Sequence, residues 1–397
     1  MRSSPTPVDE LPQPDEDSIE RSSQVIAAIA EAGAASGGVI GFAEYMRIAL
    51  YHPGSGYYSS GQVGFGEQGD FITAPEVSTL FSRCIANQVA EVLQRFDRGY
   101  VIEFGAGSGV MAADILLQLE TLGALPEQYL ILELSAALQQ RQLQTLQQRA
   151  GHLLDRVEWI STLPDEPLDA VVLANEVLDA MPVERFRIEG GRAERMMIGC
   201  EQGGLYSDYE PASDALAAAV ANIESRIGGA LPQAYCSEVN LNIAPWLRAL
   251  RASLSRGLVL LIDYGYPAAE YYLPERDRGT LICHYRHRAH GNPFWFPGLQ
   301  DISAFVDFSD VAYSATDNGF HVAGFTTQAA FLMGCGLADL HEASLTEDAT
   351  TRLKLAQQIK TLTLPSEMGE KFRVMGLTVD HDEPLSGFML QDHRGKL

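Results

Sequence analysis

From residue 100 onward, short apolar runs alternate with longer segments in which apolar residues recur at helical spacing. This alternation is typical of a parallel sheet that is covered by helices on both faces. The predicted strands are 100–104, 129–133, 157–160, 170–174 and 258–263, the predicted helices are 110–122, 136–150 and 243–254, and 320–326 and 372–379 return to the sheet. The pattern therefore predicts an α/β fold with a mostly parallel sheet.

The segments outside this pattern indicate a second lobe of mixed α and β structure. Residues 19–34 and 42–50 show helical periodicity, and residues 185–198 predict a hairpin that turns at Gly190-Gly191. We expect a disordered tail at 1–18, N-terminal helices and a loop that closes over a ligand at 19–98, the core at 99–182 and 232–266, an inserted hairpin and helix at 183–231, a substrate-lobe insertion at 267–319, and a return to the core sheet at 320–397.

The charge of the chain restricts its partners. Twenty-eight basic and 52 acidic side chains give a formal net charge of −24 at pH 7. A nucleic acid or an anionic membrane is therefore not expected as the primary partner, whereas a protein segment that carries arginine or lysine would be attracted. The five cysteines are scattered and form no CxxC pair, which predicts a reducing compartment. The acidic first residues and the absence of a long apolar stretch favour a cytoplasmic protein without a membrane span.

The strongest local signal is the segment 101–109 (VIEFGAGSG), in which a predicted strand meets a glycine-dense turn and then a helix. Gly105, Ala106, Gly107 and Gly109 are candidate cofactor-binding residues, because such a turn lets the backbone approach a ligand closely. A dinucleotide fingerprint that starts at Gly105 would require glycine where Val110 stands, so a dehydrogenase is the weaker reading.

Two acidic residues flank this turn. Glu103 lies inside the first strand, where a carboxylate would repel a pyrophosphate but attract a cation such as the sulfonium and ammonium of S-adenosylmethionine. Glu133 ends the second strand, 28 residues after Gly105, where an acid can accept hydrogen bonds from ribose hydroxyls. A helix cap or a surface position is the alternative for Glu133. The glutamine-rich run 139–148 that follows is interpreted as the solvated face of a helix.

The predicted fourth strand ends in Asn175 and Glu176, with Asp179 shortly after. Ligands of open parallel sheets bind at the carboxyl ends of the strands, so these side chains are expected near the cofactor and the methyl acceptor. Carboxylates at this position can bind and polarise a guanidinium. The structural alternative is that Glu176 or Asp179 caps a helix.

Cys283, His284, His287 and His290 form a group of possible metal ligands. His284 and His287 could share a helical face, but arginines intervene and no pair of carboxylates is nearby in the sequence. Contacts of the second lobe are the preferred interpretation, so no metal is expected.

Seven ordered segments resemble one family, the MidA-type methyltransferases, which include mitochondrial complex I assembly-factor methyltransferases and bacterial relatives. The segments are 52–58 (HPGSGYY), 69–76 (GDFITAPE), 103–109 (EFGAGSG), 175–182 (NEVLDAMP), 263–265 (DYG), 297–308 (PGLQDISAFVDF) and 368–372 (MGEKF). The resemblance covers about residues 36–380. This chain has Phe-Gly-Ala-Gly at 104–107, where many relatives have a variant with Leu or Pro. This difference is expected to leave the function of the loop intact.

The resemblance implies a class I methyltransferase (Rossmann-like) sheet with an added lobe and S-adenosylmethionine as methyl donor. It also implies, as for the mitochondrial members, methylation of an arginine on a subunit of respiratory complex I. By position, the cofactor would be bound by Gly105, Gly107, Glu133 and Asn175, and the loop that closes over it would contain Asp70, Thr73, Pro75 and Glu76. Glu176, Asp179 and Asp70 are the expected catalytic carboxylates.

Three functions remain open at this point. The first is a protein arginine methyltransferase, the second a methyltransferase for a small molecule, and the third an assembly chaperone that binds the cofactor with little catalysis. The sequence does not distinguish a monomer from a homodimer, nor does it identify the acceptor or the number of methyl groups added.

Overall fold

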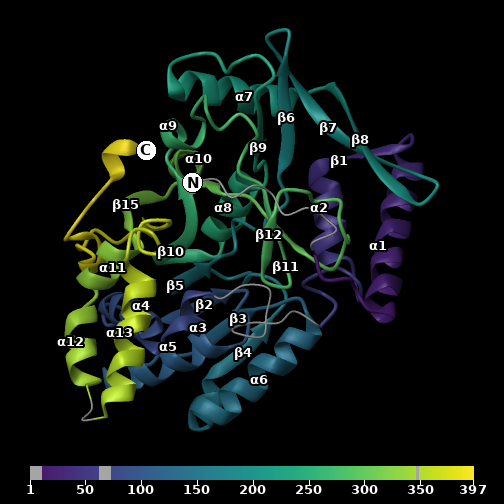
Figure 1. Ribbon diagram of the computed structural model, residues 1–397. Helices are drawn as coiled ribbons and strands as arrows, with labels where there is room; N and C mark the ends of the chain where they lie inside the picture. The colour runs from purple at the N-terminus through teal and green to yellow at the C-terminus, as the bar shows by residue number, and fades with distance from the viewer. Residues whose placement is uncertain (1–10, 62–72, 346–347) are drawn as a thin grey trace. The chain divides into compact units, whose positions relative to one another are not determined.

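The computed structural model describes residues 11–61, 73–345 and 348–397 (Figure 1). The chain divides into two compact units, each built from three separate segments. Unit 1 comprises Met1–Phe71, Asp179–Ile243 and Tyr266–Asp307, and unit 2 comprises Ile72–Leu178, Ala244–Gly265 and Phe308–Leu397. Each unit therefore brings together parts of the chain that are far apart in sequence.

The central sheet lies in unit 2 and has the strand order β15-β16-β10-β5-β2-β3-β4. The strands that pair in parallel are β2 (Tyr100–Phe104), β3 (Tyr129–Leu132), β4 (Val157–Ile160), β5 (Leu168–Asn175) and β10 (Leu254–Tyr266). Strand β16 (Phe372–Val379) runs antiparallel to both β10 and β15 (His321–Thr327). The strand order changes direction between β2 and β5, which is where open α/β sheets bind their ligands.

This sheet confirms the predicted α/β fold class, because every predicted strand of the core is present. The bounds of β2, β4 and β16 agree with the prediction, whereas β10 begins four residues before the predicted Leu258, at Leu254. The parallel sheet with one reversed strand, β16, next to its edge is the Rossmann-like arrangement of class I methyltransferases.

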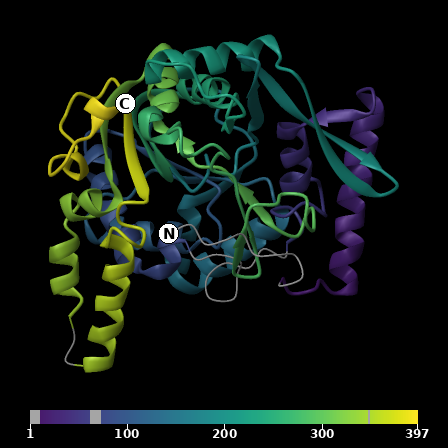
Figure 2. The same ribbon diagram turned by 45° about the horizontal axis from the view of Figure 1, so that its top comes forward.

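Besides the sheet, unit 2 contains helices. They are α3 (Ala74–Val77), α4 (Thr79–Leu93), α5 (Val110–Thr121), α6 (Ala136–Ala150), α8 (Ile243–Ala252), α10 (Phe308–Asp317), α11 (Gln328–Gly334), α12 (Leu337–Ala343) and α13 (Ala349–Thr363), with short 3-10 turns at Gly151–Arg156, Ser386–Phe388 and Arg394–Lys396. Helices α12 and α13 run side by side in both views (Figures 1 and 2).

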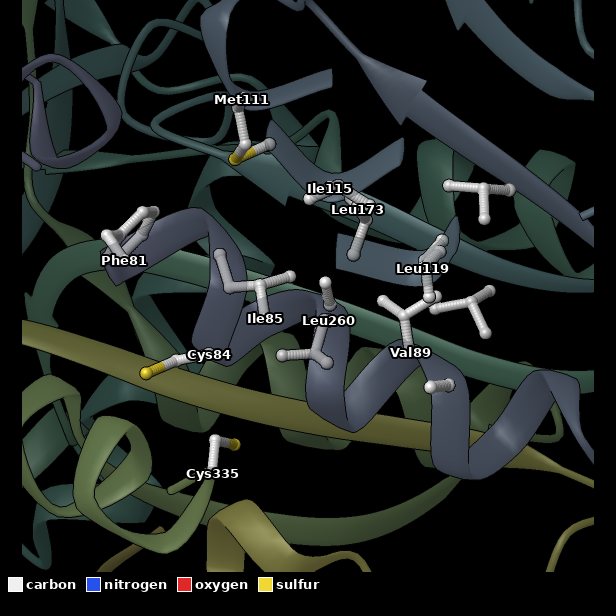
Figure 3. Packing of buried hydrophobic residues seen from close by; sticks show 14 of the residues in the cluster. Phe81, Cys84, Ile85, Val89, Met111, Ile115, Leu119, Leu173, Leu260 and Cys335 are labelled. Carbon is white, nitrogen blue, oxygen red and sulfur yellow. The ribbon is translucent and has the colours of Figure 1, made fainter. Parts of the chain in front are cut away.

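The core of unit 2 lies between the sheet and helices α4 and α5 (Figure 3). Phe81, Ile85 and Val89 repeat at spacings of four along α4 and are fully buried. They face Leu173 of β5 and Leu260 of β10, which are partners in the sheet. Each fully buried side chain of this size contributes roughly 1.5–3 kcal/mol to stability. This packing stabilises β5, which ends in the candidate site residue Asn175.

Unit 1 contains two small sheets and several helices. The first sheet has the order β1-β7-β6-β9, with β8 paired to β7, and the second has the order β12-β11-β13. The elements are α1 (Glu16–Ala35), β1 (Val39–Gly41), α2 (Phe42–Tyr51), β6 (Glu184–Glu189), β7 (Arg192–Glu201), β8 (Gly204–Pro211), α7 (Asp214–Ile227), β9 (Cys236–Val239), α9 (Ala268–Tyr271), β11 (Ile282–Tyr285), β12 (Arg288–His290), β13 (Asp301–Ser303) and β14 (Val306–Asp307). The predicted hairpin at Gly190-Gly191 is present as β6 and β7.

The observed division differs from the expected segment boundaries in several places. Helix α1 begins at Glu16, inside the expected tail, because Asp15 caps it by accepting a hydrogen bond from the Ser18 backbone N–H at 2.8 Å. Strand β9 joins the sheet of unit 1 because it pairs with β6, although it was expected in the core. Helices α4 and α10 belong to unit 2. No helix of the described residues is both long and apolar enough to cross a membrane.

Candidate functional site

The predicted site residues of unit 2 gather at one edge of its sheet. Glu103 lies on β2 and the glycine turn follows that strand, Glu133 follows β3, and Asn175 ends β5. Strand β2 pairs in parallel with both β3 and β5. The carboxyl ends of these three strands are therefore neighbours, and the side chains that follow them converge at the point where the strand order changes direction.

The glycine turn requires backbone conformations that other residues rarely adopt. Gly105, Gly107 and Gly109 have φ angles of 60°, 53° and 83°. A Cβ atom on Gly109 would lie 2.9 Å from the Cα of Gln142, so this glycine is needed for close packing of the turn on α6. A Cβ atom on Gly105 would meet only a methyl group of Val177, at 4.0 Å. The backbone at Gly105 is therefore open for the approach of a ligand.

Glu103 is a buried carboxyl group on β2, with 1% of its surface exposed. The Tyr129 hydroxyl donates a hydrogen bond to Glu103 Oε2 at 2.7 Å. Burial raises the pKa of Glu103 to about 7, the Tyr129 hydrogen bond acts against this shift, and the nearby charge of Glu133 adds to it. A cation that binds beside Glu103 would favour the ionised form of this carboxyl.

Glu133 is also buried, and its carboxylate accepts hydrogen bonds from backbone N–H groups, that of Leu134 among them, and from one side chain. The Ser135 backbone N–H donates to Oε1 at 2.9 Å, and Gln142 Nε2 donates to Oε2 at 3.0 Å. Burial raises the pKa of Glu133. A carboxylate offers about four lone-pair sites, so this group can still accept hydrogen bonds from a ligand. The next residue, Leu134, is an exposed apolar side chain at the same edge.

Gln142 corrects the interpretation of the glutamine-rich run 139–148 as a solvated face. It is fully buried, and its Nε2 also donates to the Gly107 carbonyl at 3.2 Å, while Trp159 Nε1 donates to its Oε1 at 2.9 Å. Sequence reasoning missed this residue, although Leu138 and Leu146 lie four positions before and after it. That spacing places Gln142 on the buried face of α6. Gln147 and Gln148 in the same run are exposed, as expected.

Asn175 and Glu176 form the polar end of β5. Asn175 Nδ2 donates to Glu176 Oε1 at 3.1 Å, and the Glu176 backbone N–H donates to the Ile262 carbonyl at 2.9 Å. Glu176 has a φ angle of 52°, a conformation uncommon for a residue other than glycine and more frequent at functional sites. Asn175 Oδ1 is buried and has no hydrogen-bond partner within the described part of the chain.

Asp263 holds the turn that follows these residues. Its side chain is fully buried, Oδ2 accepts from the Leu178 backbone N–H at 3.0 Å, and Oδ1 accepts from the Tyr264 backbone N–H at 2.9 Å. The family resemblance includes the segment 263–265 but implies no role for Asp263. The structure assigns Asp263 a structural role at the end of β10.

The residues expected in the closing loop are only partly described. Thr73 directly precedes the short helix α3 without a side-chain capping hydrogen bond, Pro75 lies in the first turn of this helix, and the Ser108 hydroxyl of the glycine turn donates a hydrogen bond to Glu76 Oε1. The structure therefore brings Glu76 to the glycine turn. Asp70 lies outside the described residues.

Asp179 belongs to unit 1, whereas the other described site residues belong to unit 2. Its side chain is buried, and its backbone carbonyl accepts a hydrogen bond from the Ala304 N–H at 3.0 Å.

The histidines that the sequence suggests as possible metal ligands lie on a β-hairpin. The expectation that His284 and His287 could share a helical face is wrong, because Arg286 and His287 form the turn between β11 and β12. His284 Nδ1 lies 3.8 Å from Asp301 Oδ2. In the described ranges, no three His, Cys, Asp or Glu side chains are arranged to hold a metal ion.

The chain is similar to proteins of one enzyme family. The family described as "Putative S-adenosyl-L-methionine-dependent methyltransferase" matches residues 84–326. Among solved structures, a protein of Burkholderia thailandensis crystallised with S-adenosyl-homocysteine is 38% identical, with a TM-score of 0.92 over 98% of this chain and 100% of that chain. A native structure of a Burkholderia thailandensis protein is 37% identical, with a TM-score of 0.89 and the same coverage.

Curated relatives are similar over most of the chain. The mitochondrial protein arginine methyltransferase NDUFAF7 of Danio rerio is 29% identical over 85% of this chain and 82% of its own length. The protein of the same name from Homo sapiens is 27% identical over 86% of this chain and 80% of its own length. Because the family match spans more than half of the chain and agrees with the sheet topology, the chain belongs to the family of S-adenosyl-L-methionine-dependent methyltransferases.

Proposed function

We propose that this methyltransferase transfers a methyl group to a guanidinium nitrogen of an arginine residue in a protein. Support comes from the curated relatives, whose printed names describe protein arginine methyltransferases and which match this chain over most of its length. The observation on this chain that carries the proposal is the pair Asn175 and Glu176, an amide and a carboxylate at the ligand-binding edge of the sheet.

The residues at this edge fit S-adenosylmethionine. The open backbone at Gly105 leaves room for close approach, and Glu133 keeps acceptor capacity for ribose hydroxyls. Glu103 supplies a buried negative charge for a ligand that carries two positive charges. The buried Asn175 Oδ1, which has no partner among the described residues, would gain one from an N–H or O–H of the ligand.

When bound, the cofactor supplies a methyl group on a positively charged sulfur. The residues of the chain must then bind and orient a guanidinium whose pKa lies far above 7. Removing its proton at pH 7 before methyl transfer would cost roughly 8 kcal/mol. Glu176 instead binds and orients the guanidinium while it is charged, and each charge-assisted hydrogen bond contributes roughly 1.5–3 kcal/mol. Glu176 can accept the proton as the nitrogen is methylated.

The partner and the compartment are part of the same proposal. A net charge of −24 favours an acceptor segment rich in arginine or lysine over a nucleic acid. All five cysteines are free, which is compatible with the reducing cytoplasm.

The test has two steps. Calorimetric titration compares S-adenosylmethionine with NAD as a control ligand, and we expect micromolar binding of the first alone. Protein and methyl-labelled S-adenosylmethionine are then incubated with a lysate of cells that lack the gene, and the protein fraction is hydrolysed to amino acids. Labelled methylarginine that disappears with Glu176→Gln would support the proposal. Label confined to small molecules, with none in the protein fraction, would overturn it.

A further inference from the structure

Gln142 connects three parts of the candidate cofactor site. Its Nε2 donates to the Gly107 carbonyl in the glycine turn at 3.2 Å and to Glu133 Oε2 at 3.0 Å. Its Oε1 accepts from Trp159 Nε1 at 2.9 Å. The side chain itself is fully buried. A single amide therefore joins the turn after β2, the acid after β3 and the strand β4.

These three contacts permit only one orientation of the amide. Both N–H groups of Nε2 face acceptors, and Oε1 faces a donor. A rotation by 180° would place Oε1 against the Gly107 carbonyl and the Glu133 carboxylate, and it would leave buried polar groups without partners. The backbone of Gln142 packs closely against the glycine turn, because a Cβ atom on Gly109 would lie 2.9 Å from the Gln142 Cα. The position of the amide is therefore determined by the fold.

We propose that Gln142 is a positioning residue for the cofactor ribose. It holds the Glu133 carboxylate in the orientation that accepts hydrogen bonds from the ribose hydroxyls, and it fixes the position of this carboxylate relative to the glycine turn. This inference rests on the proposed role of Glu133. The terminal torsion of a glutamate is broad, so hydrogen bonds decide where its oxygens point. Without Gln142, only the backbone N–H groups of Leu134 and Ser135 would hold the carboxylate, and Oε2 would lose the donor that Gln142 supplies.

The test compares a ligand that contains both ribose hydroxyls with one that lacks the 2′-hydroxyl. The two ligands are S-adenosylhomocysteine and its 2′-deoxy analogue, and the measured quantity is the ratio of their dissociation constants. Gln142→Met keeps an unbranched side chain of similar length but removes the amide. Gln147→Met is the matched control, since Gln147 is an exposed residue of the same helix.

For the wild type we expect the 2′-deoxy analogue to bind at least tenfold more weakly. Gln142→Met should bring this ratio close to one and weaken S-adenosylhomocysteine by about tenfold. Gln147→Met should behave as the wild type. A general loss of stability would weaken both ligands equally and leave the ratio unchanged, so the ratio separates positioning from folding.

A second variant covers the case in which Gln142→Met does not fold. Trp159→Phe removes the donor to Gln142 Oε1 while the amide remains, and it should lower the ratio by a smaller factor, about two to three. An unchanged ratio in a folded Gln142→Met protein, or in Trp159→Phe when the first variant is unfolded, overturns the role of Gln142. A wild-type protein that binds neither ligand, or binds both equally, would instead overturn the proposed site at Glu133 and this inference with it.

Discussion

Glu103 is a carboxyl group that the fold buries on β2 at a cost to stability. Its pKa is raised to about 7 by burial, above the usual 4.5. Between these two pH values the folded protein binds a proton that the unfolded chain has released. The contribution of Glu103 to the free energy of unfolding therefore falls as the pH rises from about 4.5 to about 7, and it stays low above pH 7.

Glu103→Gln should for this reason stabilise the protein at pH 8 but not at pH 4.5. The amide oxygen can still accept the Tyr129 hydrogen bond, and the gain at pH 8 should be on the order of 3 kcal/mol. Urea unfolding at both pH values measures the difference, with the exposed Glu158→Gln as control. An equal change in the free energy of unfolding at the two pH values would contradict a raised pKa of Glu103.

The same variant should bind the cofactor more weakly. S-adenosylmethionine is cationic, so it binds better when Glu103 is ionised, and the wild-type affinity should fall as the pH drops from 8 to 6 through the pKa of about 7. In Glu103→Gln, this part of the pH dependence should disappear and the affinity should be roughly tenfold lower at pH 8. Calorimetry across this range provides the data. A wild-type affinity that rises on acidification would refute the role of Glu103.

Two glycines of the turn should respond differently to alanine. Gly105→Ala has room for the methyl group, so the fold should lose only about 1–2 kcal/mol from the positive φ, while cofactor affinity should fall at least tenfold because the backbone approach is filled. Gly109→Ala would place Cβ 2.9 Å from the Gln142 Cα and should lower both stability and affinity. Thermal melts and titrations distinguish the two patterns. Equal losses of stability would argue against the described packing.

At the scale of elements, strand β10 depends on Gly257. This residue has a φ angle of 146° just after an irregularity in the pairing with β5, and an added Cβ would lie 1.9 Å from the Ala170 carbonyl oxygen. Gly257→Ala should therefore destabilise the protein by about 3 kcal/mol or more, because the central strands must separate. Gly151→Ala has no atom within 4 Å of its added Cβ and is the control. Chemical unfolding of both variants measures the effect, and similar midpoints would contradict it.

The elements that the sequence predicted well are those with a strong local pattern. Strands β2, β4 and β16 and helix α6 were predicted with the observed bounds, because short apolar runs and helical spacing are visible in a single segment. Strand β8 was missed, since none of its residues is buried and its apolar pattern is weak. Strand β8 forms because it pairs with β7 in an antiparallel arrangement, and this pairing is a tertiary contact.

At the scale of the whole molecule, the acidic charge should assist binding of a cationic acceptor. We expect the KM for an arginine-rich peptide to rise several-fold between 50 and 500 mM NaCl with little change in kcat, because salt shortens the Debye length from more than 10 Å to less than 8 Å. A peptide with the same arginine flanked by aspartates should show no such rise. Methylation kinetics at the two salt concentrations measure this effect. A KM that does not change with salt would contradict the idea that the acidic charge of the chain attracts the acceptor.

The sequence by itself determined the α/β fold class, the positions of the core strands, the glycine turn and the acids Glu103 and Glu133, because these follow from local periodicity and from residue types at strand ends. Only the tertiary structure decided that Gln142 is buried between the turn and Glu133, that Glu103 has a raised pKa, and that Asp179 belongs to unit 1. Each of these depends on segments that are distant in sequence. Burial, hydrogen-bond partners and electrostatic shifts arise only when such segments pack together.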